Sequence, residues 1–301
     1  MQQTRNELLP SLGIIFSAML WGLFWIPVRA IEQTGVSALW TGPVLFACVA
    51  LIFLPVALIR RKALYRAGPG LILTGLLPGT AFALYTVSFN LTDVVHALLL
   101  FYMSPIWSTL LGLVFLRERL NINRLAALIL GLGGLVVVLG DGISFPWPRQ
   151  IGDWFALLSG LCWSLASVRL FRGGNTLIFE KTFAFITGSF IAGVALALLP
   201  LGLDNVFPDM AVLKQVWIWI AVIALLMLPA TWLTIWPTTI LSPARIGILF
   251  MTEAIVGIGS AAWLTNEPFG LREIIGTVLI MSAGLVEVLY TPRALKKISG
   301  T

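Results

Sequence analysis

The stretch that decides the fold is residues 94–116, VVHALLLFYMSPIWSTLLGLVFL. It is apolar and long enough to cross a bilayer, because a spanning helix needs about 20 apolar residues. It also carries His96, Tyr102 and Trp107, which a simple lipid anchor does not need. A similar stretch, RIGILFMTEAIVGIGSAAWL, follows at residues 245–264. The pattern predicts two copies of one unit, each contributing such a helix to a shared cavity.

The composition indicates an integral membrane protein. Of the 301 residues, 59% are hydrophobic and only 11% are charged, whereas about a quarter of the residues in soluble domains are charged. The net charge of +6 would suggest a nucleic-acid partner only if the basic residues shared a soluble face, and they lie in loops instead. Cys48 and Cys162 fall within apolar runs without CxxC spacing, so we expect neither a disulfide nor a metal site.

About ten apolar runs follow one another, separated by short links that hold charges or turn residues. The hydrocarbon region of a membrane tolerates only helices or closed barrels, and runs of this length lack the alternation of barrel strands. The first run has no small-residue cleavage site behind it, so we expect it to be a retained helix and not a signal peptide. The predicted helices lie near residues 12–31, 37–59, 69–91, 94–116, 122–140, 154–171, 178–200, 214–240, 244–264 and 271–290.

An internal repeat organises these helices. Several short matches recur in chain order about 140 to 151 residues apart, and we take them from the printed sequence. They are Leu77-Pro78-Gly79-Thr80 with Leu228-Pro229-Ala230-Thr231, Leu100-Phe101 with Leu249-Phe250, Glu118 with Glu267, Trp21-Gly22-Leu23 with Trp163-Ser164-Leu165, and residues 134–139 with 284–289. Five spans per copy is an odd number, so the second copy enters the membrane from the opposite side. The fold class predicted is an all-α membrane protein with two inverted five-helix repeats, residues 1–147 and 148–301, and a substrate site between them.

The basic residues orient the chain, because Lys and Arg favour cytoplasmic loops. If the amino terminus is cytoplasmic, all but four of the 19 Lys and Arg residues fall on the cytoplasmic side of the predicted spans. The four on the outer side are Arg29, Arg149, Lys214 and Arg272. We therefore predict that both termini are cytoplasmic.

The tandem units, Trp21-Gly22, and Glu118 and Glu267 just past the fourth and ninth spans resemble the drug/metabolite transporter superfamily, in its ten-helix EamA-type branch. The many Trp residues and the stretch HALLLFYMSPIW are similar to bacterial aromatic amino acid exporters of that family. The resemblance implies export of aromatic amino acids across an inner membrane by alternating access. It also implies a cavity surrounded by the first four helices of each half, with the fifth and tenth helices outside.

Aromatic residues near the middle of predicted spans are the first candidates for substrate binding. Tryptophan normally gathers at the membrane interfaces, so tryptophan at mid-span needs another explanation. Such residues either pack helices or form cavity walls, and aromatic walls suit a flat aromatic ligand. The candidates are Trp21, Trp107, Trp163, Trp232 and Trp236.

Two titratable residues are the next candidates. His96, the single histidine, lies at the start of the fourth span and is either structural or a donor to a substrate carboxylate. Glu253 lies near the middle of the ninth span, where a carboxylate is costly and usually faces a cavity or a partner. It is either a buried structural group or a contact for a substrate ammonium or a proton. Glu287, near the end of the last span, is expected at the membrane interface.

Further polar candidates are Tyr85, Asn90, Tyr102 and Ser164, whose side chains can hydrogen-bond the ends of a zwitterion. Pro78 and Pro229 occupy matching places in the third and eighth spans. Proline removes one helix hydrogen bond, so the pair marks either static kinks or hinges. Glycines in the fifth and tenth spans allow close helix approach, within one chain or at a dimer seam.

These features favour a secondary transporter of small amphipathic metabolites, with aromatic amino acids as the leading substrates. Broad efflux of lipophilic compounds is the alternative. A membrane enzyme is disfavoured because the motifs HExxH and GxSxG are absent. A nucleotide-driven pump is excluded because the sequence has no GxxxxGK[ST] loop. We expect no catalytic residue and no cofactor. The expected partners are a small-molecule substrate and the lipid bilayer, not nucleic acid, for a monomer or homodimer.

Overall fold

The computed structural model describes residues 2–24, 26, 30–31, 33–92, 97, 100–118, 120–139, 148–174, 177–200, 206–265 and 270–290, and the regular structure within these ranges is helical. The helices are α1 (Gln2–Gly22), α3 (Ala38–Ile59), α4 (Arg61–Arg66), α5 (Gly70–Leu91), α7 (Ser104–Leu116), α8 (Ile122–Leu139), α9 (Ile151–Arg172), α10 (Ile178–Ala197), α11 (Met210–Thr238), α12 (Pro243–Phe250), α13 (Thr252–Thr265) and α14 (Leu271–Tyr290).

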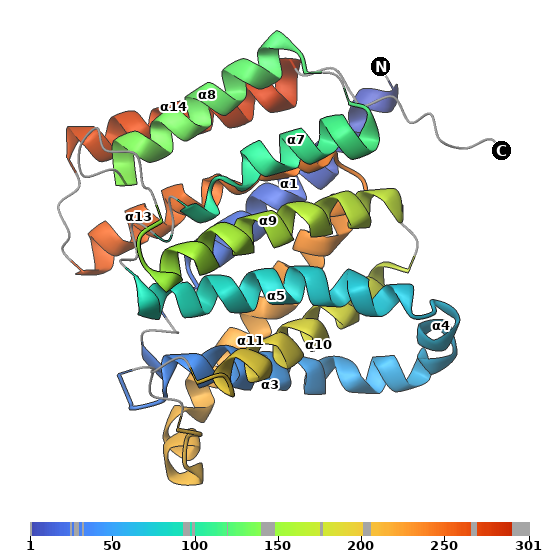
Figure 1. Ribbon diagram of the computed structural model, residues 1–301, viewed down its shortest axis with the longest axis vertical. Helices are drawn as coiled ribbons and strands as arrows, with labels where there is room; N and C mark the ends of the chain where they lie inside the picture. The colour runs from blue at the N-terminus through green and yellow to red at the C-terminus, as the bar shows by residue number, and fades with distance from the viewer. Residues whose placement is uncertain are drawn as a thin grey trace.

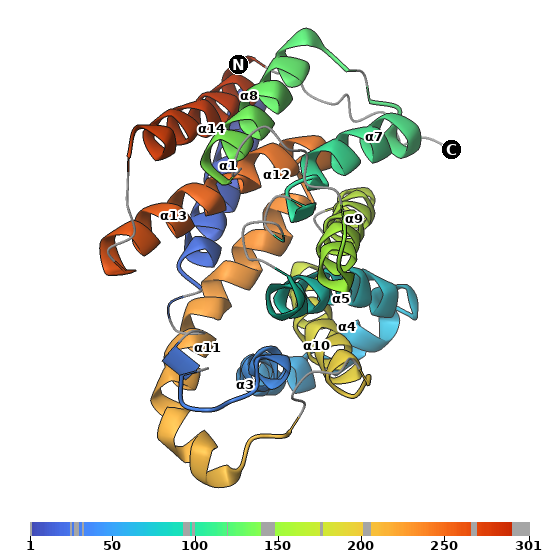
Figure 2. The same ribbon diagram turned by 60° about the vertical axis from the view of Figure 1, so that its left-hand side comes forward.

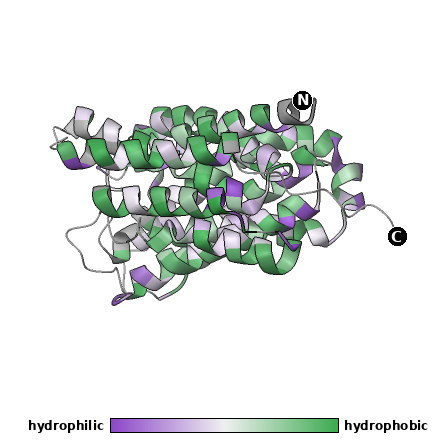
Figure 3. Cartoon of the chain, turned by 90° about the horizontal axis from the view of Figure 1, so that it is seen from above, coloured by the Kyte–Doolittle hydropathy of each residue, from purple (hydrophilic) through white to green (hydrophobic). Residues whose placement is uncertain are grey.

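Among the described helices, α3, α5, α9, α10 and α11 are long and apolar enough to cross a membrane. They correspond to predicted spans near residues 37–59, 69–91, 154–171, 178–200 and 214–240. The apolar parts of α1, α7, α8 and α14 are shorter. Figure 3 shows hydrophobic residues along most of the helix length. The predicted all-helical membrane architecture therefore agrees with the structure at this coarse level.

Two of the predicted spans are interrupted in the structure. Residues 244–264 form two helices, because α12 ends at Phe250 and α13 begins at Thr252. In residues 94–116, Tyr102 and Met103 form a turn before α7 begins at Ser104. The prediction of a continuous helix in each place was wrong. Pro105, in the first turn of α7, has no N–H to continue a preceding helix.

The second break is held by a side chain. The Thr252 hydroxyl donates to the carbonyl of Leu249 at 2.8 Å, so a carbonyl at the break keeps a partner. Both breaks follow directly after the Phe of the repeated Leu-Phe pair, Phe101 in one case and Phe250 in the other. Apolar composition alone does not reveal such interruptions, because the residues on both sides remain hydrophobic.

The helices are arranged in layers (Figures 1 and 2). α8 pairs with α14 at one edge, and α3 packs against α10 toward the opposite edge. Between these pairs, α5 lies against α9 and α10, α9 also contacts α7, and α1 contacts α11, α12 and α13. The core therefore runs through the centre of the bundle, where all eight residues of α12 are buried.

Glycines set the closest helix approaches. A Cβ on Gly75 of α5 would lie 2.1 Å from the carbonyl oxygen of Ala184 in α10. A Cβ on Gly134 of α8 would lie 2.7 Å from the carbonyl oxygen of Gly276 in α14. Small residues let helix backbones meet. The glycines predicted in the fifth and tenth spans thus pack these two helices together within the chain.

One end of the bundle carries most of its ion pairs, and we call it the basic end. It is defined by Arg60, Arg124, Arg169, Arg172 and Arg245, and it lies on the right in Figure 1. The start of α1 and the end of α14 meet there, because Glu7 pairs with Arg245 and Glu287 with Arg124. The start of α1 and the end of α14 therefore lie at the same end of the bundle.

Candidate functional site

A cavity opens in the middle of the bundle, with about 440 Å³ of empty space including its mouth. Its described walls come from α1, α5, α9, α10, α11, α12 and α13 and from the residue before the α7 turn. The lining residues are Trp21, Pro78, Ala81, Phe82, Tyr85, Phe101, Trp163, Phe185, Thr234, Phe250 and Glu253. The lining is mostly apolar with a few placed polar groups, as is usual for small-ligand sites.

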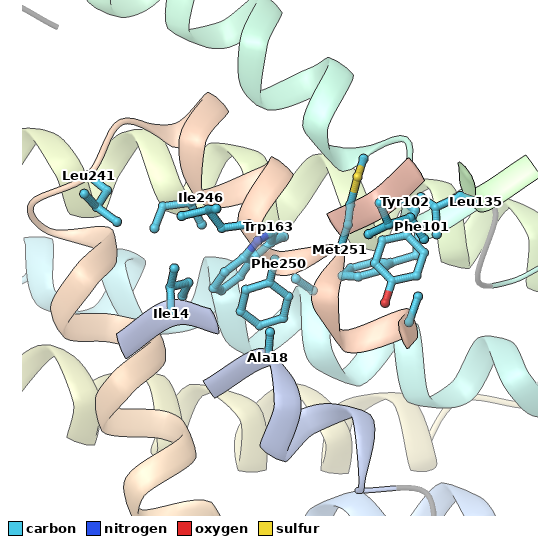
Figure 4. Close-up of a cluster of buried hydrophobic side chains, with 14 residues drawn as sticks. Ile14, Ala18, Phe101, Tyr102, Leu135, Trp163, Leu241, Ile246, Phe250 and Met251 are labelled. Atoms are coloured by element: carbon cyan, nitrogen blue, oxygen red, sulfur yellow. The ribbon is translucent and has the colours of Figure 1, made fainter. Parts of the chain in front are cut away.

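The cavity walls are built from pairs of aromatic rings. Tyr85 and Phe101 have ring centroids 4.3 Å apart, and Trp163 and Phe250 lie 5.6 Å apart. Figure 4 shows the Trp163 and Phe250 rings beside Ala18 of α1, with Phe101 and Tyr102 grouped beyond Met251. The two helix breaks therefore deliver Phe101 and Phe250 to the same aromatic cluster.

A hydrogen-bond network fixes the wall formed by α1 and α11. The Trp21 indole N–H donates to the Thr234 hydroxyl at 2.9 Å, and Thr234 donates to the Ala230 carbonyl at 2.8 Å. The Ser17 hydroxyl lies 2.6 Å from the Thr234 hydroxyl. These bonds hold the Trp21 ring, which packs 5.2 Å from Phe82 between centroids.

The position directly after Trp21 has no room for a side chain and is occupied by Gly22. A Cβ at this position would lie 2.5 Å from the Glu253 carbonyl oxygen of α13. The close approach of α1 to α13 brings the first turn of α13 to the cavity. Ser164 follows Trp163 as Gly22 follows Trp21, and it makes a comparable close contact. Its hydroxyl donates to the Ser104 carbonyl at 3.0 Å, at the start of α7.

Glu253 stands in the first turn of α13 and lines the cavity. Tyr85 and Tyr102 both interact electrostatically with its carboxylate. The Tyr102 hydroxyl is buried beside Glu253 but does not reach a hydrogen bond of ordinary geometry. Among the described lining residues Glu253 carries the one carboxyl group, and none is a lysine, arginine or histidine. The cavity thus combines a carboxylate, nearby phenol groups and aromatic faces.

Part of the predicted site meets at this cavity. Trp21, Tyr85, Trp163 and Glu253 line it, and Tyr102 belongs to the adjoining core. The predicted hinge residue Pro78 also lines it, inside the continuous helix α5. Sequence reasoning missed its phenylalanines Phe82, Phe101, Phe185 and Phe250 and also Thr234. The repeated Leu-Phe pair was a signal for two of them, although it was used only to detect the repeat.

Other predicted residues lie away from the cavity. Ser164 is buried, with its hydroxyl on the carbonyls of Ser104 and Gly160. Trp232 is 37% exposed on the surface of α11, and Trp236 packs beside Gly13 of α1. Trp107 is not among the lining residues, and its buried indole N–H makes no hydrogen bond within the described structure. Substrate contact by these four stays a prediction without support from this cavity.

Of four further residues named from the sequence, two fall outside the described part of the structure, one is not in the cavity lining, and one is more buried than expected. His96 and the side chain of Asn90 lie outside the described residues. Pro229 lies inside α11 and is not a lining residue of the cavity. Glu287 was expected at the interface, but its side chain is fully buried, 3.6 Å from Arg124. The reason is that α8 packs along α14 and brings a buried arginine to it.

The Arg124 cluster is the largest group of buried charges at the basic end. Arg124 lies 2.7 Å from Glu118 and 3.6 Å from Glu287, with both carboxylates almost wholly buried. Burial raises the pKa of the Glu118 carboxyl above its usual value, and the Arg124 guanidinium lowers it in part. Arg124 is therefore the shared cationic partner of two buried carboxylates.

Several polar contacts at the basic end join residues before 147 to residues after 148. Arg60 pairs with Glu180 at 2.6 Å, Glu7 with Arg245 at 3.4 Å, and Arg124 with Glu287. Arginines of α9 extend the same seam: Arg169 donates to the Gly70 carbonyl at 2.6 Å, and Arg172 donates to the Phe115 carbonyl. This end of the bundle is thus closed by contacts between the two parts of the chain.

No group of three His, Cys, Asp or Glu side chains gathers as a metal site within the described ranges. Cys48 and Cys162 are free thiols. The described cavity offers one carboxyl group, the Tyr85 phenol and aromatic surfaces for binding.

Comparisons with known proteins find that part of this chain is similar to transporters. Residues 8–140 match the model of the EamA-like transporter family. Two proteins of Bacillus subtilis (strain 168) are similar, the uncharacterized transporters YoaV and YojE. YoaV is 27% identical over 162 residues, 52% of this chain and 55% of YoaV. YojE is 27% identical over 147 residues, 45% of this chain and 49% of YojE.

The chain therefore spans about half the length of the curated relatives it matches. A solved crystal structure is similar over 92% of this chain and 95% of that chain, with a TM-score of 0.69 and 21% sequence identity. At that identity the likeness concerns the fold alone. Together with the apolar helices, the family match supports a multi-pass membrane protein. The amino-terminal part of this chain is similar to EamA-like transporters, and nearly the whole chain shares its fold with a protein of known structure.

Proposed function

We propose that this protein is a secondary transporter that exports small aromatic metabolites, aromatic amino acids among them, across an inner membrane by alternating access. The observation that carries the proposal is the aromatic cavity at the meeting of the two halves, residues 1–147 and 148–301. Trp21, Phe82 and Phe101 come from the first half, and Trp163 and Phe250 from the second. Stacking of this kind favours a flat aromatic ligand by about 0.5–1.5 kcal/mol per ring.

The helix pairing supports an inverted repeat of the two halves. α1 packs against α11 and α13, and α9, which takes the place of α1 in the second copy, packs against α5 and α7. Exchanging the two halves converts one set of contacts into the other. The breaks after Phe101 and Phe250 also correspond. Interrupted helices near the midplane are characteristic of transporter substrate sites.

The contacts at the basic end support a conformation closed on that side. Alternating access requires the halves to separate at one end and then at the other. Separation at the basic end would break the Arg60–Glu180 and Glu7–Arg245 pairs and free Arg169 from Gly70. By the bias of Lys and Arg, this end faces the cytoplasm. We therefore assign these contacts the role of an inner gate.

Transport by the purified chain in proteoliposomes tests the proposal. We expect saturable counterflow of labelled phenylalanine or tryptophan, and inhibition by other small aromatic metabolites. Replacement of Trp163 by Ala should lower this flux, because Trp163 forms a cavity wall with Phe250. Absence of saturable flux for every aromatic compound tried would contradict the proposal.

A crosslink tests the gate separately. Cysteines placed at Arg60 and Glu180, in a chain with Cys48 and Cys162 changed to Ser, should be joined by a short bifunctional thiol reagent. We expect the crosslink to stop flux while ligand binding persists. The two single-cysteine variants treated with the same reagent are the controls. Full flux in the crosslinked protein would exclude a gate at this place.

Broad efflux of neutral lipophilic compounds is the second candidate, and the mostly apolar cavity wall favours it. Competition separates the two functions. A carrier that requires the amino group of its substrate should be insensitive to indole, whereas a broad efflux carrier should be inhibited by it.

A further inference from the structure

The charges around the cavity point to a narrower class of substrate than aromatic metabolites in general. An amino acid brings an ammonium and a carboxylate into the cavity, and each needs a partner when it leaves water. Glu253 is a partner for the ammonium. Among the described lining residues there is no Lys or Arg for the carboxylate.

Two of the neutral polar groups of the cavity are already engaged. The Trp21 N–H donates to Thr234, and the Thr234 hydroxyl donates to the Ala230 carbonyl. Neither is available to a ligand carboxylate without breaking a bond inside the protein. A buried polar group left without a partner costs about 1–3 kcal/mol, and a charged group costs more.

The phenol groups near Glu253 also favour a cation. Tyr85 lines the cavity together with Glu253, and Tyr102 lies in the adjoining core; a phenol O–H can donate a hydrogen bond to a carboxylate. A ligand carboxylate placed near Glu253 would instead meet a like charge. The polar side of the cavity therefore attracts an ammonium and repels an anion.

The aromatic walls act in the same direction. The faces of Trp, Tyr and Phe rings carry partial negative charge, and they attract cations, Trp most strongly. Trp21, Trp163 and Phe250 line the same cavity as Glu253. A positively charged amine on an aromatic body fits both the faces and the carboxylate.

We propose that the cavity selects small aromatic amines that carry a positive charge and no carboxylate, in preference to the corresponding amino acids. Glu253 holds the ammonium group and is the residue that determines this specificity. The proposal rests on the proposed transport function for its physiological meaning, but it concerns binding and is tested by binding.

The experiment compares three ligands that share one ring and chain: phenethylamine, phenylalanine and 2-phenylethanol. Equilibrium binding to the purified protein in detergent is measured at neutral pH. Phenethylamine should bind about tenfold or more tightly than phenylalanine, because both ligands offer an ammonium to Glu253 but only phenylalanine brings a carboxylate that finds no Lys or Arg in the described lining. Glu253→Gln should weaken phenethylamine binding by about tenfold or more and leave 2-phenylethanol binding unchanged.

Two further variants complete the test. Glu253→Asp keeps the charge and should retain part of the amine preference. Asp209→Asn removes an exposed carboxylate at the start of α11 and is the matched control, with no change expected. Equal or tighter binding of phenylalanine would overturn the proposal, as would an unchanged amine preference in Glu253→Gln. If that phenylalanine binding were lost in His96→Ala, the missing carboxylate partner would be His96.

The two proposals fail in different ways. Amine-selective binding that depends on Glu253, without flux of any aromatic compound in proteoliposomes, would contradict transport and leave the specificity assignment standing. Saturable flux of phenylalanine that does not depend on Glu253 would support transport and overturn the specificity assignment.

Discussion

The basic end and the cavity use charge in opposite ways. At the basic end, Glu118, Glu180 and Glu287 each lie beside an arginine of another helix or loop. In the cavity, Glu253 lies among aromatic rings, and the described lining holds no arginine or lysine. A buried charge is tolerated when it is paired and hydrogen-bonded. Charges at the basic end therefore join helices, whereas the absence of a cation from the described lining around Glu253 supports the proposal that this residue meets a ligand.

Removing the central cation should have the largest effect. Arg124→Leu would leave Glu118 and Glu287 buried without their partner, and breaking a buried pair in this way costs about 3–5 kcal/mol. Thermal unfolding in detergent measures the loss. Arg61→Leu, at an exposed site on α4, is the matched control and should change stability by no more than about 0.5 kcal/mol. Equal effects of both variants would remove the distinction between the two regions.

Glu253→Gln should act in the opposite direction on stability. Removal of a charge that has no cationic partner in the cavity should stabilise the unliganded protein by about 0.5–2 kcal/mol, at the expense of ligand binding. Glu287→Gln, which unpairs Arg124 in part, should destabilise it. The same unfolding measurement compares the two. A loss of stability in Glu253→Gln would mean that its carboxylate serves the fold as those at the basic end do.

The pH dependence of stability should distinguish Glu118 and is the smallest effect. Burial raises its pKa in the folded protein, so the folded state binds the proton more tightly than the unfolded state does. The stabilisation that Glu118 gives the folded state is therefore fully present below the ordinary pKa of a Glu side chain. It is lost as pH rises through the raised pKa of Glu118 in the folded protein. The slope in that interval is at most about 1.4 kcal/mol per pH unit. Glu118→Gln should remove this contribution, and an unchanged slope between pH 4 and 7 would contradict it.

Much of the fold could be predicted from the sequence because the membrane imposes simple rules on it. The apolar runs at residues 37–59, 69–91 and 178–200 coincide with helices, since the backbone in hydrocarbon must satisfy its own hydrogen bonds. The breaks after Phe101 and Phe250 were not predicted, because Ser104-Pro105 and Thr252-Glu253 are short interruptions in runs that stay hydrophobic overall. Glu287 was placed at the interface for a related reason, since a sequence does not show that Arg124 lies next to it.

The residues of the candidate site also differ in whether the sequence could identify them. Mid-span position identified Trp21, Trp163 and Glu253, because aromatic and charged residues there need an explanation that lipid does not give. Position along a helix does not determine which side of the helix faces the cavity. Trp232 is therefore on the surface while Thr234, two residues later, lines the cavity.

By itself the sequence determined an all-helical, lipid-embedded chain with one carboxylate among aromatic mid-span residues, because hydropathy and the cost of buried charge act locally along the chain. Only the tertiary structure decided which residues share the cavity and which arginine lies beside each carboxylate at the basic end. Those relations depend on how helices far apart in the sequence cross, and close contacts such as Gly22 with Glu253 and Gly75 with Ala184 set those crossings. Helix crossing is a property of packing, and a one-dimensional pattern does not contain it.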